Sequence, residues 1–417
     1  MMRKLIIWVL ALLLIVTMLP LFAFAAEPAP SIQSESGFLI DLKSGQVLYS
    51  KNENERLYPA SITKIMTAIL ALENSKLDEQ VVTSKRATEQ EGNRIYLVEG
   101  ETQSMENMLY GLLLNSGNDA AIAIAEHVAG SVEKFADMMN QKAKELGATN
   151  THFVTPNGLH DPQHYTTAHD MTLIARYAMQ NPKFREIVAT ETRPWHGKEW
   201  ESVLNNINPM LYNYEGATGV KTGFTDQAMQ TMVFSAKRGD RELIGTLMFA
   251  QTKQAIRLDA TALLDYGFAN FNTRQIAAKD KIVSTNAIHY TDDLKTSVKT
   301  GADLYYTYPA GSNPNIQSQI KLNPPAKPPL QAGSVVGSME FTADGKPIGS
   351  VPLLADQSIP SPTFTQRIAM LHVSRWWYAL LPAPFLFIGF IYRRTRFRST
   401  RELNLNQLQD YRNQNYF

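Results

Sequence analysis

The sequence predicts an α/β (α+β) domain over residues 31–272, followed by a small all-β, sandwich-like domain over residues 275–360. Strand-like segments lie at both ends of the first region with helical segments between them, so distant parts of the chain are expected to complete one sheet. After about Asn272 the helical periodicity disappears, and short alternating segments are separated by Gly, Pro and Asn. A chain of 417 residues is also too long for one ordinary core.

Five segments of the first region carry clear patterns, after a Pro/Ser-rich lead-in. Residues 36–52 surround a Lys-Ser-Gly turn and residues 229–250 surround Arg-Gly-Asp, so each is predicted to form a pair of strands. Helical spacing of apolar residues predicts helices over 61–72, 102–146 and 254–267. The second of these is expected to break at Asn115–Asp119 and at Gly130.

Composition excludes several classes of function. Hydrophobic residues make up 44% of the chain and charged residues 19%, which is typical of a folded globular protein with added apolar segments. The formal net charge is +1 and the body has no long basic run, which argues against nucleic acid as a partner. There is no cysteine, so thiol catalysis, disulfides and thiolate metal sites are excluded.

The N-terminal segment indicates export. Arg3 and Lys4 precede a long apolar run, and Ala23-Phe24-Ala25 has the small-x-small pattern of a cleavage site. We therefore expect a signal peptide over residues 1–25, with an uncleaved membrane helix as the alternative. Both interpretations take the body of the chain out of the cytoplasm.

A second apolar segment, Trp376–Tyr392, has no internal charge and precedes four arginines. It predicts a transmembrane anchor over 376–392 with a cytoplasmic basic and polar tail over 393–417, which would hold the body at the outer face of the membrane. Seventeen residues are near the lower limit for a spanning helix, and Pro382 and Pro384 weaken it. A buried helix or an in-plane anchor is the alternative.

Ser-x-x-Lys occurs three times, at Ser61/Lys64, Ser131/Lys134 and Ser318/Lys321. Ser131 opens a helical segment and is most simply an N-cap. Ser318 lies in a segment whose alternating pattern predicts a strand, where a lysine three positions later points to the other side. Ser61 is predicted in the first turn of a helix with Lys64 on the same face, which places a hydroxyl beside an amine at the positive helix end.

A serine hydroxyl becomes a good nucleophile only when a base takes its proton. Lys64 can be that base if burial or a nearby cation lowers its pKa. Lys221, on a strand-like segment, offers such a cation, and Ser116 and Asn118 lie on a helix break that would face a cleft. Each residue alone has a structural explanation, and a second Lys-Thr-Gly at 299–301 shows that this triplet is uninformative by itself. Together they predict one reaction centre.

The blocks SITK, SGN and KTG, in that order, resemble the serine penicillin-binding enzymes and class A β-lactamases. The resemblance is closer to the low-molecular-mass D-alanyl-D-alanine carboxypeptidases, since PASITKIMTA, NSGNDAAIAIAEHVAG, MNQKAKELGATNTHFVTPNGL, YTTAHDM and GVKTGFT all look like blocks of that family. The similarity covers about residues 35–360. It implies a transpeptidase/β-lactamase-like catalytic domain followed by a β-sandwich-like domain.

By this resemblance, the substrate is a peptidoglycan stem peptide ending in D-Ala-D-Ala, β-lactams acylate the enzyme, and no cofactor or metal is needed. Ser61 is then the nucleophile, Lys64 its base, and Ser116 the relay of a proton to the leaving nitrogen. The family's oxyanion hole uses backbone N–H groups, here those of Ser61 and Phe224. The remaining implied substrate-binding residues are Asn118, Lys221, Thr222, Gly223 and Thr225, with Gly223 expected to let the substrate approach closely.

Some features depart from the family or leave alternatives open. Met229 stands where the family usually has glycine, and its side chain is expected to narrow the cleft or shift the strand. Residues 155–170 contain no glutamate, which disfavours a β-lactamase. A D,D-endopeptidase and a catalytically impaired penicillin-binding sensor or wall-binding protein remain open. His160, Asp161, His164, His169 and Asp170 crowd together, but their spacing predicts a loop of solvated polar groups and not a metal site.

Overall fold

The computed structural model describes residues 28–291, 294–323, 328–365 and 385–396. These residues divide into two compact units. The first contains the described residues up to Ile276 together with Leu304–Asn315, and the second contains Ala277–Asp303 and the described residues from Ile316 onward. The signal peptide predicted over 1–25, most of the predicted anchor and nearly all of the predicted tail lie outside the described residues.

The first unit is built around a five-stranded antiparallel sheet with the order β2-β1-β9-β8-β7. Its strands come from the two ends of the unit, as the sequence predicts: β1 (Ser36–Asp41), β2 (Val47–Lys51), β7 (Ala217–Thr225), β8 (Met229–Arg238) and β9 (Arg241–Ala250). β1 pairs with β9 across about two hundred residues, Phe38 lying opposite Thr246. The sheet therefore joins the two ends of the unit, and β7 lies at one of its edges.

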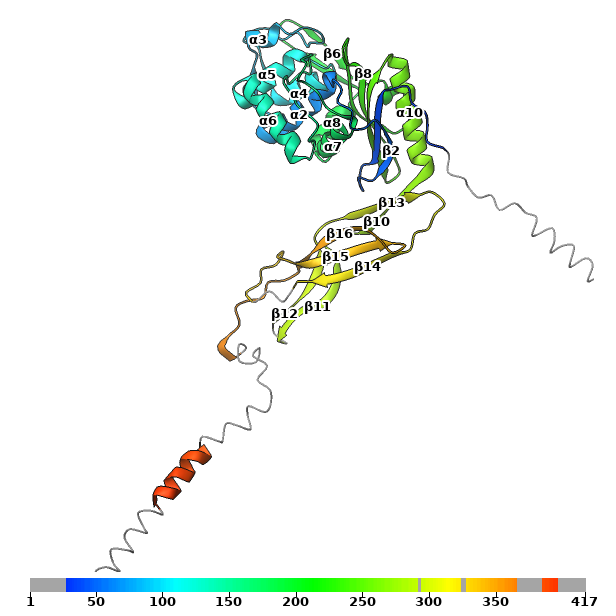
Figure 1. The fold of residues 1–417 in the computed structure, drawn as a ribbon. Helices are drawn as coiled ribbons and strands as arrows, with labels where there is room; N and C mark the ends of the chain where they lie inside the picture. Colours follow the sequence, from blue (N-terminus) through cyan, green and yellow to red (C-terminus); the bar gives the residue numbers. More distant parts are fainter. Residues whose placement is uncertain (1–27, 292–293, 324–327, 366–384, 397–417) are drawn as a thin grey trace, which may run out of the picture. The chain divides into compact units, whose positions relative to one another are not determined.

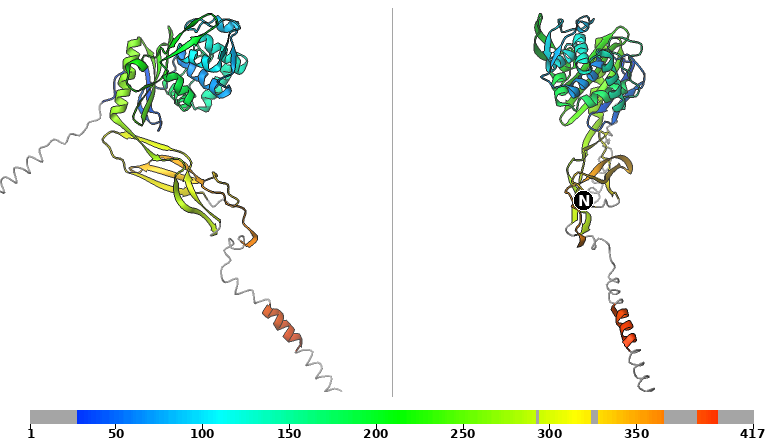
Figure 2. Two further views of the ribbon diagram at one scale, coloured as in Figure 1. Left: turned by 180° about the vertical axis from the view of Figure 1, so that it is seen from behind. Right: turned by 90° about the vertical axis from the view of Figure 1, so that its left-hand side faces the viewer.

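Helices cover both faces of this sheet, which lies between α10 and a helical cluster (Figures 1 and 2). The cluster and its neighbours comprise α2 (Lys64–Asn74), α4 (Met105–Leu113), α5 (Asn118–Ala129), α6 (Val132–Glu145), α7 (Ala168–Ala178) and α8 (Pro182–Ala189), and α10 spans Lys253–Asn270. Alternate strand residues reach the two cores: Phe38 and Ile40 pack with the cluster, whereas Leu39 packs with α10. This period-two pattern is what a strand buried on both faces requires.

The remaining elements of this unit are short. They are η1 (Ala60–Thr63), β3 (Gln80–Val82), α3 (Lys85–Thr88), β4 (Thr102–Ser104), β5 (Thr192–His196), β6 (Glu201–Asn205) and α9 (Met210–Asn213). The prediction of a helix from residue 102 is wrong for its first three residues, which pair with β3. The helix starts at Met105 because the Ser104 hydroxyl caps it, accepting from Asn107 N. The predicted break at Gly130 is confirmed, where the backbone turns left-handed at φ 79°.

The second unit is an antiparallel β domain, which confirms the predicted class. Its sheet has the order β11-β12-β16-β15-β14 and encloses a small core that includes Val298, Val336 and Leu353. The strands are β11 (Ile282–Thr291), β12 (Leu294–Thr300), β14 (Ile316–Leu322), β15 (Val335–Ala343) and β16 (Lys346–Ala355). A separate pair, β10 (Phe271–Ala277) and β13 (Leu304–Pro309), lies mostly in the first unit.

Residues 385–396 are helical and exposed. Within the described ranges, no helix is both long enough and apolar enough to cross a membrane.

Candidate active site

Ser61 lies in η1, the single 3-10 turn that runs directly into α2 at Lys64. The tight turn keeps both side chains on one side, with Nζ of Lys64 2.8 Å from Oγ of Ser61. β8 fixes this turn, because the Thr231 hydroxyl donates to the Pro59 carbonyl at 2.8 Å. The serine and lysine that the spacing singled out are therefore in direct contact, where proton transfer between them needs no third group.

The Lys64 amine is completely buried. It donates to Oδ1 of Asn118 and to the carbonyl of Asn157, both at 2.7 Å. These two oxygens can only accept, so they take two N–H groups of the amine. A neutral amine has no third N–H, so its lone pair points to the remaining neighbour, the hydroxyl of Ser61. The contacts thus suit a neutral lysine that accepts the serine proton.

The electrostatics favour the same protonation state. Burial lowers the pKa of Lys64 well below its ordinary value, and the charge of Lys221 lowers it further, whereas Asp119 opposes the shift. Burial also lowers the pKa of Lys221, to about 7. Lys221 projects from β7 with only 1% of its surface exposed, and its Nζ donates to the carbonyl of Thr222 at 2.9 Å. Lys64 and Lys221 are therefore two buried amines whose charges act on one another.

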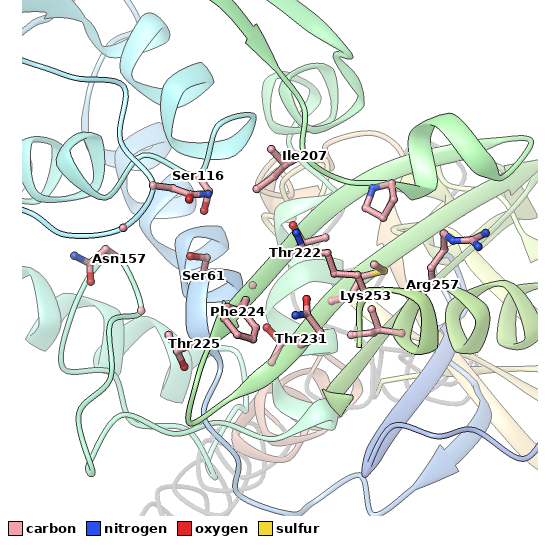
Figure 3. Close-up of a pocket in the computed structure, with 18 of the residues that line it drawn as sticks. Ser61, Ser116, Asn157, Ile207, Thr222, Phe224, Thr225, Thr231, Lys253 and Arg257 are labelled. Atoms are coloured by element: carbon pink, nitrogen blue, oxygen red, sulfur yellow. The ribbon is translucent and has the colours of Figure 1, made fainter. Parts of the chain in front are cut away.

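An open cleft of about 810 Å³ lies above these amines. In Figure 3, Ser61, Ser116 and Asn157 lie to the left, and Thr222, Lys253 and Arg257 lie to the right. Seven of the residues predicted from the sequence line this cleft: Ser61, Ser116, Asn118, Thr222, Gly223, Phe224 and Thr225. Lys64 and Lys221 are the two that do not, because both are buried behind the lining: Lys64 contacts Ser61 and Asn118, and Lys221 contacts Thr222.

Ser116 owes its place in the cleft to an unusual backbone. Its φ is 62°, in the left-handed region that a non-glycine residue seldom adopts. The turn is held on both sides, since Gly117 N donates to the Gly111 carbonyl and Asn118 N to the Asn93 carbonyl. Asn118 then begins α5 and reaches Lys64. The predicted helix break therefore delivers two polar side chains to one site.

Gly223 lies against the backbone of Ser61. A Cβ at this position would be 2.7 Å from Ser61 N and 2.5 Å from Oγ1 of Thr231. Only glycine allows β7 to approach η1 this closely. The glycine is thus required for strand-to-turn packing, which is a different reason from the close substrate approach expected from the sequence.

Three residues that the sequence did not single out also shape the site. The Asn157 carbonyl accepts from Lys64, while its side chain donates to Gln90 at 2.9 Å. Lys253 and Arg257 lie one turn apart at the start of α10 and line the far end of the cleft (Figure 3). The backbone contact of Asn157 leaves no signal in the sequence. Lys253 and Arg257 could have been identified from the sequence, because they are two cations four residues apart at the start of a predicted helix.

Two expectations about individual residues need correction or refinement. The prediction of a loop of solvated polar groups is wrong for His164 and Asp170, because each is only 1% exposed and is hydrogen-bonded within the protein. In the parts of the chain that the structure describes, no cluster of potential metal ligands is found. Met229 is not among the residues lining the cleft, so the expected narrowing by its side chain is not found, and its φ of 51° lies in the left-handed region that glycine adopts more easily.

Comparisons with known proteins agree with this geometry. Residues 23–252 match the family model described as D-alanyl-D-alanine carboxypeptidase, and residues 271–361 match the C-terminal domain of penicillin-binding protein 5. The D-alanyl-D-alanine carboxypeptidase DacF of Bacillus subtilis is 32% identical over 80% of this chain and 87% of its own. DacC of Escherichia coli is 33% identical over 85% of this chain and 92% of its own.

Solved structures show the same likeness. Penicillin-binding protein 5 of Haemophilus influenzae superposes with a TM-score of 0.69 at 28% identity, covering 80% of this chain and 99% of that one. The DD-transpeptidase of Streptomyces K15 gives a TM-score of 0.56 at 35% identity, covering 58% of this chain and 99% of that one. The chain therefore belongs to the D-alanyl-D-alanine carboxypeptidase family of serine peptidases, the low-molecular-mass penicillin-binding proteins.

Proposed function

We propose that this chain removes the terminal D-alanine from peptidoglycan stem peptides through an acyl intermediate on Ser61, with Lys64 as the base. The proposal rests on the contact of 2.8 Å between Oγ of Ser61 and a buried Lys64 amine whose two hydrogens, in its neutral form, are taken by two carbonyl oxygens. A buried amine of lowered pKa next to a serine is the arrangement that nucleophilic catalysis needs.

The reaction proceeds in two steps, acylation of Ser61 and hydrolysis of the acyl-enzyme. Lys64 accepts the proton of Ser61 as Oγ bonds to the carbonyl carbon between the two D-alanines. The oxyanion meets the backbone N–H groups of Ser61 and Phe224, and a proton relayed through Ser116 reaches the nitrogen as the C–N bond breaks. Free D-alanine leaves, and water then cleaves the serine ester, returning the proton to the hydroxyl. One such oxyanion donor is typically worth about 3–4 kcal/mol.

The terminal carboxylate of the substrate requires a positively charged end of the cleft. Lys221 supplies charge from below, and Thr222 and Thr225 offer hydroxyls from β7, while Asn118 orients the substrate amide. Arg257 adds a guanidinium from α10 that faces the same cleft. A guanidinium binds a carboxylate well because two parallel N–H groups match its two oxygens.

Penicillin labelling combined with product analysis tests this function. The full-length protein should bind a fluorescent penicillin covalently and release D-alanine from a pentapeptide, both detectable by mass spectrometry. Ser61→Ala should abolish labelling and release, whereas Ser318→Ala, in another Ser-x-x-Lys, should change neither. An unlabelled wild-type protein would favour the impaired sensor or wall-binding alternative.

Two neighbouring activities share this nucleophile. A D,D-endopeptidase would cut a cross-linked peptide dimer faster than the pentapeptide, so the ratio of these two rates separates it from a carboxypeptidase. A β-lactamase would release the penicillin adduct quickly. We expect a long-lived adduct instead, since no glutamate occurs over residues 155–170 to activate water for deacylation.

We also propose that the body, with domains over 31–272 and 275–360, is exported by the segment 1–25 and held at the membrane by the segment 376–392. The support is the apolar sequence and its arginine-rich flank. Truncation after residue 365 should move penicillin-labelled protein from the membrane fraction to the soluble fraction. An unchanged membrane fraction would contradict the anchor.

A further inference from the structure

His164 is a buried histidine that the proposed reaction does not use. Only 1% of its surface is exposed, and it is not among the cleft-lining residues. It lies on the segment that follows α6 and carries Asn157, and its ring contacts η1 through Thr63. Thr63 in turn lies between Ser61 and Lys64. This position links the histidine to the site without contact with the substrate.

The hydrogen bonds of the ring fix its tautomer. The backbone N–H groups of Val154 and Thr155 both point at Nδ1, at 3.0 and 3.2 Å. An N–H can only donate, so Nδ1 must carry the lone pair. The proton of the neutral ring is then on Nε2, which donates to Oγ1 of Thr63 at 2.9 Å.

If the ring were protonated, Nδ1 would carry an N–H that points at the N–H groups of Val154 and Thr155, and these donors would repel one another. The environment opposes protonation as well, because burial lowers the pKa of His164 to about 3. Asp161 opposes this shift, and His152 and His160 reinforce it. His164 is therefore neutral over the working range of the enzyme, with a defined donor and a defined acceptor.

The His164–Thr63 bond is one of three that join this segment to the start of α2. The hydroxyl of Thr67 donates to the Pro156 carbonyl at 2.6 Å, and Lys64 donates to the Asn157 carbonyl at 2.7 Å. The segment packs so tightly that a Cβ on Gly158 would be 2.0 Å from the Ala60 carbonyl. The segment therefore closes the amine side of Lys64 against water.

We infer that His164 is a positioning residue, whose Nε2–H bond to Thr63 holds the Asn157 carbonyl against the Lys64 amine and keeps water from it. This inference rests on the proposed role of Lys64 as base. His164 does not take the proton itself, because both of its nitrogens are engaged and it lies outside the cleft. Its effect passes through Thr63 and Asn157.

Thr63 permits a clean test, since valine replaces the hydroxyl with a methyl group of similar size, whereas serine retains the hydroxyl. In the full-length protein, Thr63→Val should slow acylation by a fluorescent penicillin about tenfold, and Thr63→Ser should restore most of the rate. His164→Asn keeps an acceptor near Nδ1 and loses the donor, so it should match Thr63→Val. The double variant should be no slower than either single one. His196→Asn, at an exposed histidine on β5, is the control and should acylate normally.

The pH profile separates positioning from general stability. Burial is the largest cause of the lowered Lys64 pKa, so water admitted to the amine should raise that pKa and move the acid limb of acylation to higher pH. Lys221 and Asp119, the charged groups that act on this amine, are unchanged in these variants.

A Thr63→Val protein with wild-type rate and profile would overturn the inference. So would a slower Thr63→Val protein whose profile is unshifted and whose loss equals its loss of folded protein. In both cases wild-type labelling and its absence in Ser61→Ala would leave the proposed function standing.

Discussion

The two Lys-Thr-Gly triplets of this chain lie in different units and have opposite properties. Lys221 on β7 is buried, and burial lowers its pKa to about 7. Lys299 on β12 is partly exposed and contacts Asp280 at 3.0 Å, and this partner raises its pKa. The same three residues thus give a coupled amine in one unit and an ordinary surface ion pair in the other. Identity of residues does not specify chemistry, because desolvation and neighbouring charges decide it.

Substitution of each lysine by alanine should give the largest difference between the two triplets in the rate of penicillin acylation. Lys221→Ala should reduce the rate of penicillin acylation about a thousandfold, because a charge that stabilises the bound anion and keeps Lys64 neutral is lost. Lys299→Ala should leave that rate unchanged. The measurement is second-order labelling kinetics on the full-length protein. Equal effects of the two substitutions would contradict different roles for Lys221 and Lys299.

The glycines of the triplets form the next pair. Gly223→Ala should slow acylation about a hundredfold, because the new methyl group displaces β7 from Ser61 N, the proposed oxyanion donor. At Gly301 the added Cβ would meet side-chain carbons of Pro352 and Leu354, at 3.0 and 3.1 Å. Gly301→Ala should therefore lower the free energy of unfolding by about 1 kcal/mol and leave kinetics intact. Rates and urea unfolding of both variants provide the check.

Acid stability tests whether the buried groups behave as the geometry requires. The pKa of His164 is lowered to about 3, so between pH 6.5 and 3 the unfolded chain binds a proton that the folded ring excludes. Stability should then fall as the pH falls through this window, by up to about 1.4 kcal/mol per pH unit. In His164→Asn this slope should be smaller, while His196→Asn should retain it. Urea unfolding at pH 4.5 and pH 7 measures the difference.

Strained turns give the smallest effect. Met229, the first residue of β8, and Asp344, between β15 and β16, have φ values of 51° and 48°. The left-handed region disfavours methionine more than aspartate, whose short polar side chain tolerates it. Met229→Gly should raise the free energy of unfolding by about 1 kcal/mol, and Asp344→Gly should change it by less. A thermal unfolding series that ranks these two substitutions the other way would contradict this explanation.

Much of the site was predictable because local chemistry marks it. Ser61 and Lys64 are three residues apart at a helix start, so a single turn places them together in any fold that forms this turn. The helix break at Ser116–Asn118 and the strand at Lys221 were also readable. The burial of His164 could not be predicted from the sequence, because its segment is rich in polar residues and its composition is typical of a solvated loop. Only packing against η1 and the backbone of Val154 removes it from water.

Local spacing and residue type suffice to predict the order of the elements, the Ser61–Lys64 pair and the likeness to the carboxypeptidase family. The folded structure alone shows that Lys221 is buried and acts on Lys64 whereas Lys299 pairs with Asp280, that Asn157 contributes its backbone, and that Gly223 packs on Ser61. The physical reason is that burial and long-range contacts, and with them the pKa of each amine, exist only after distant segments have folded together.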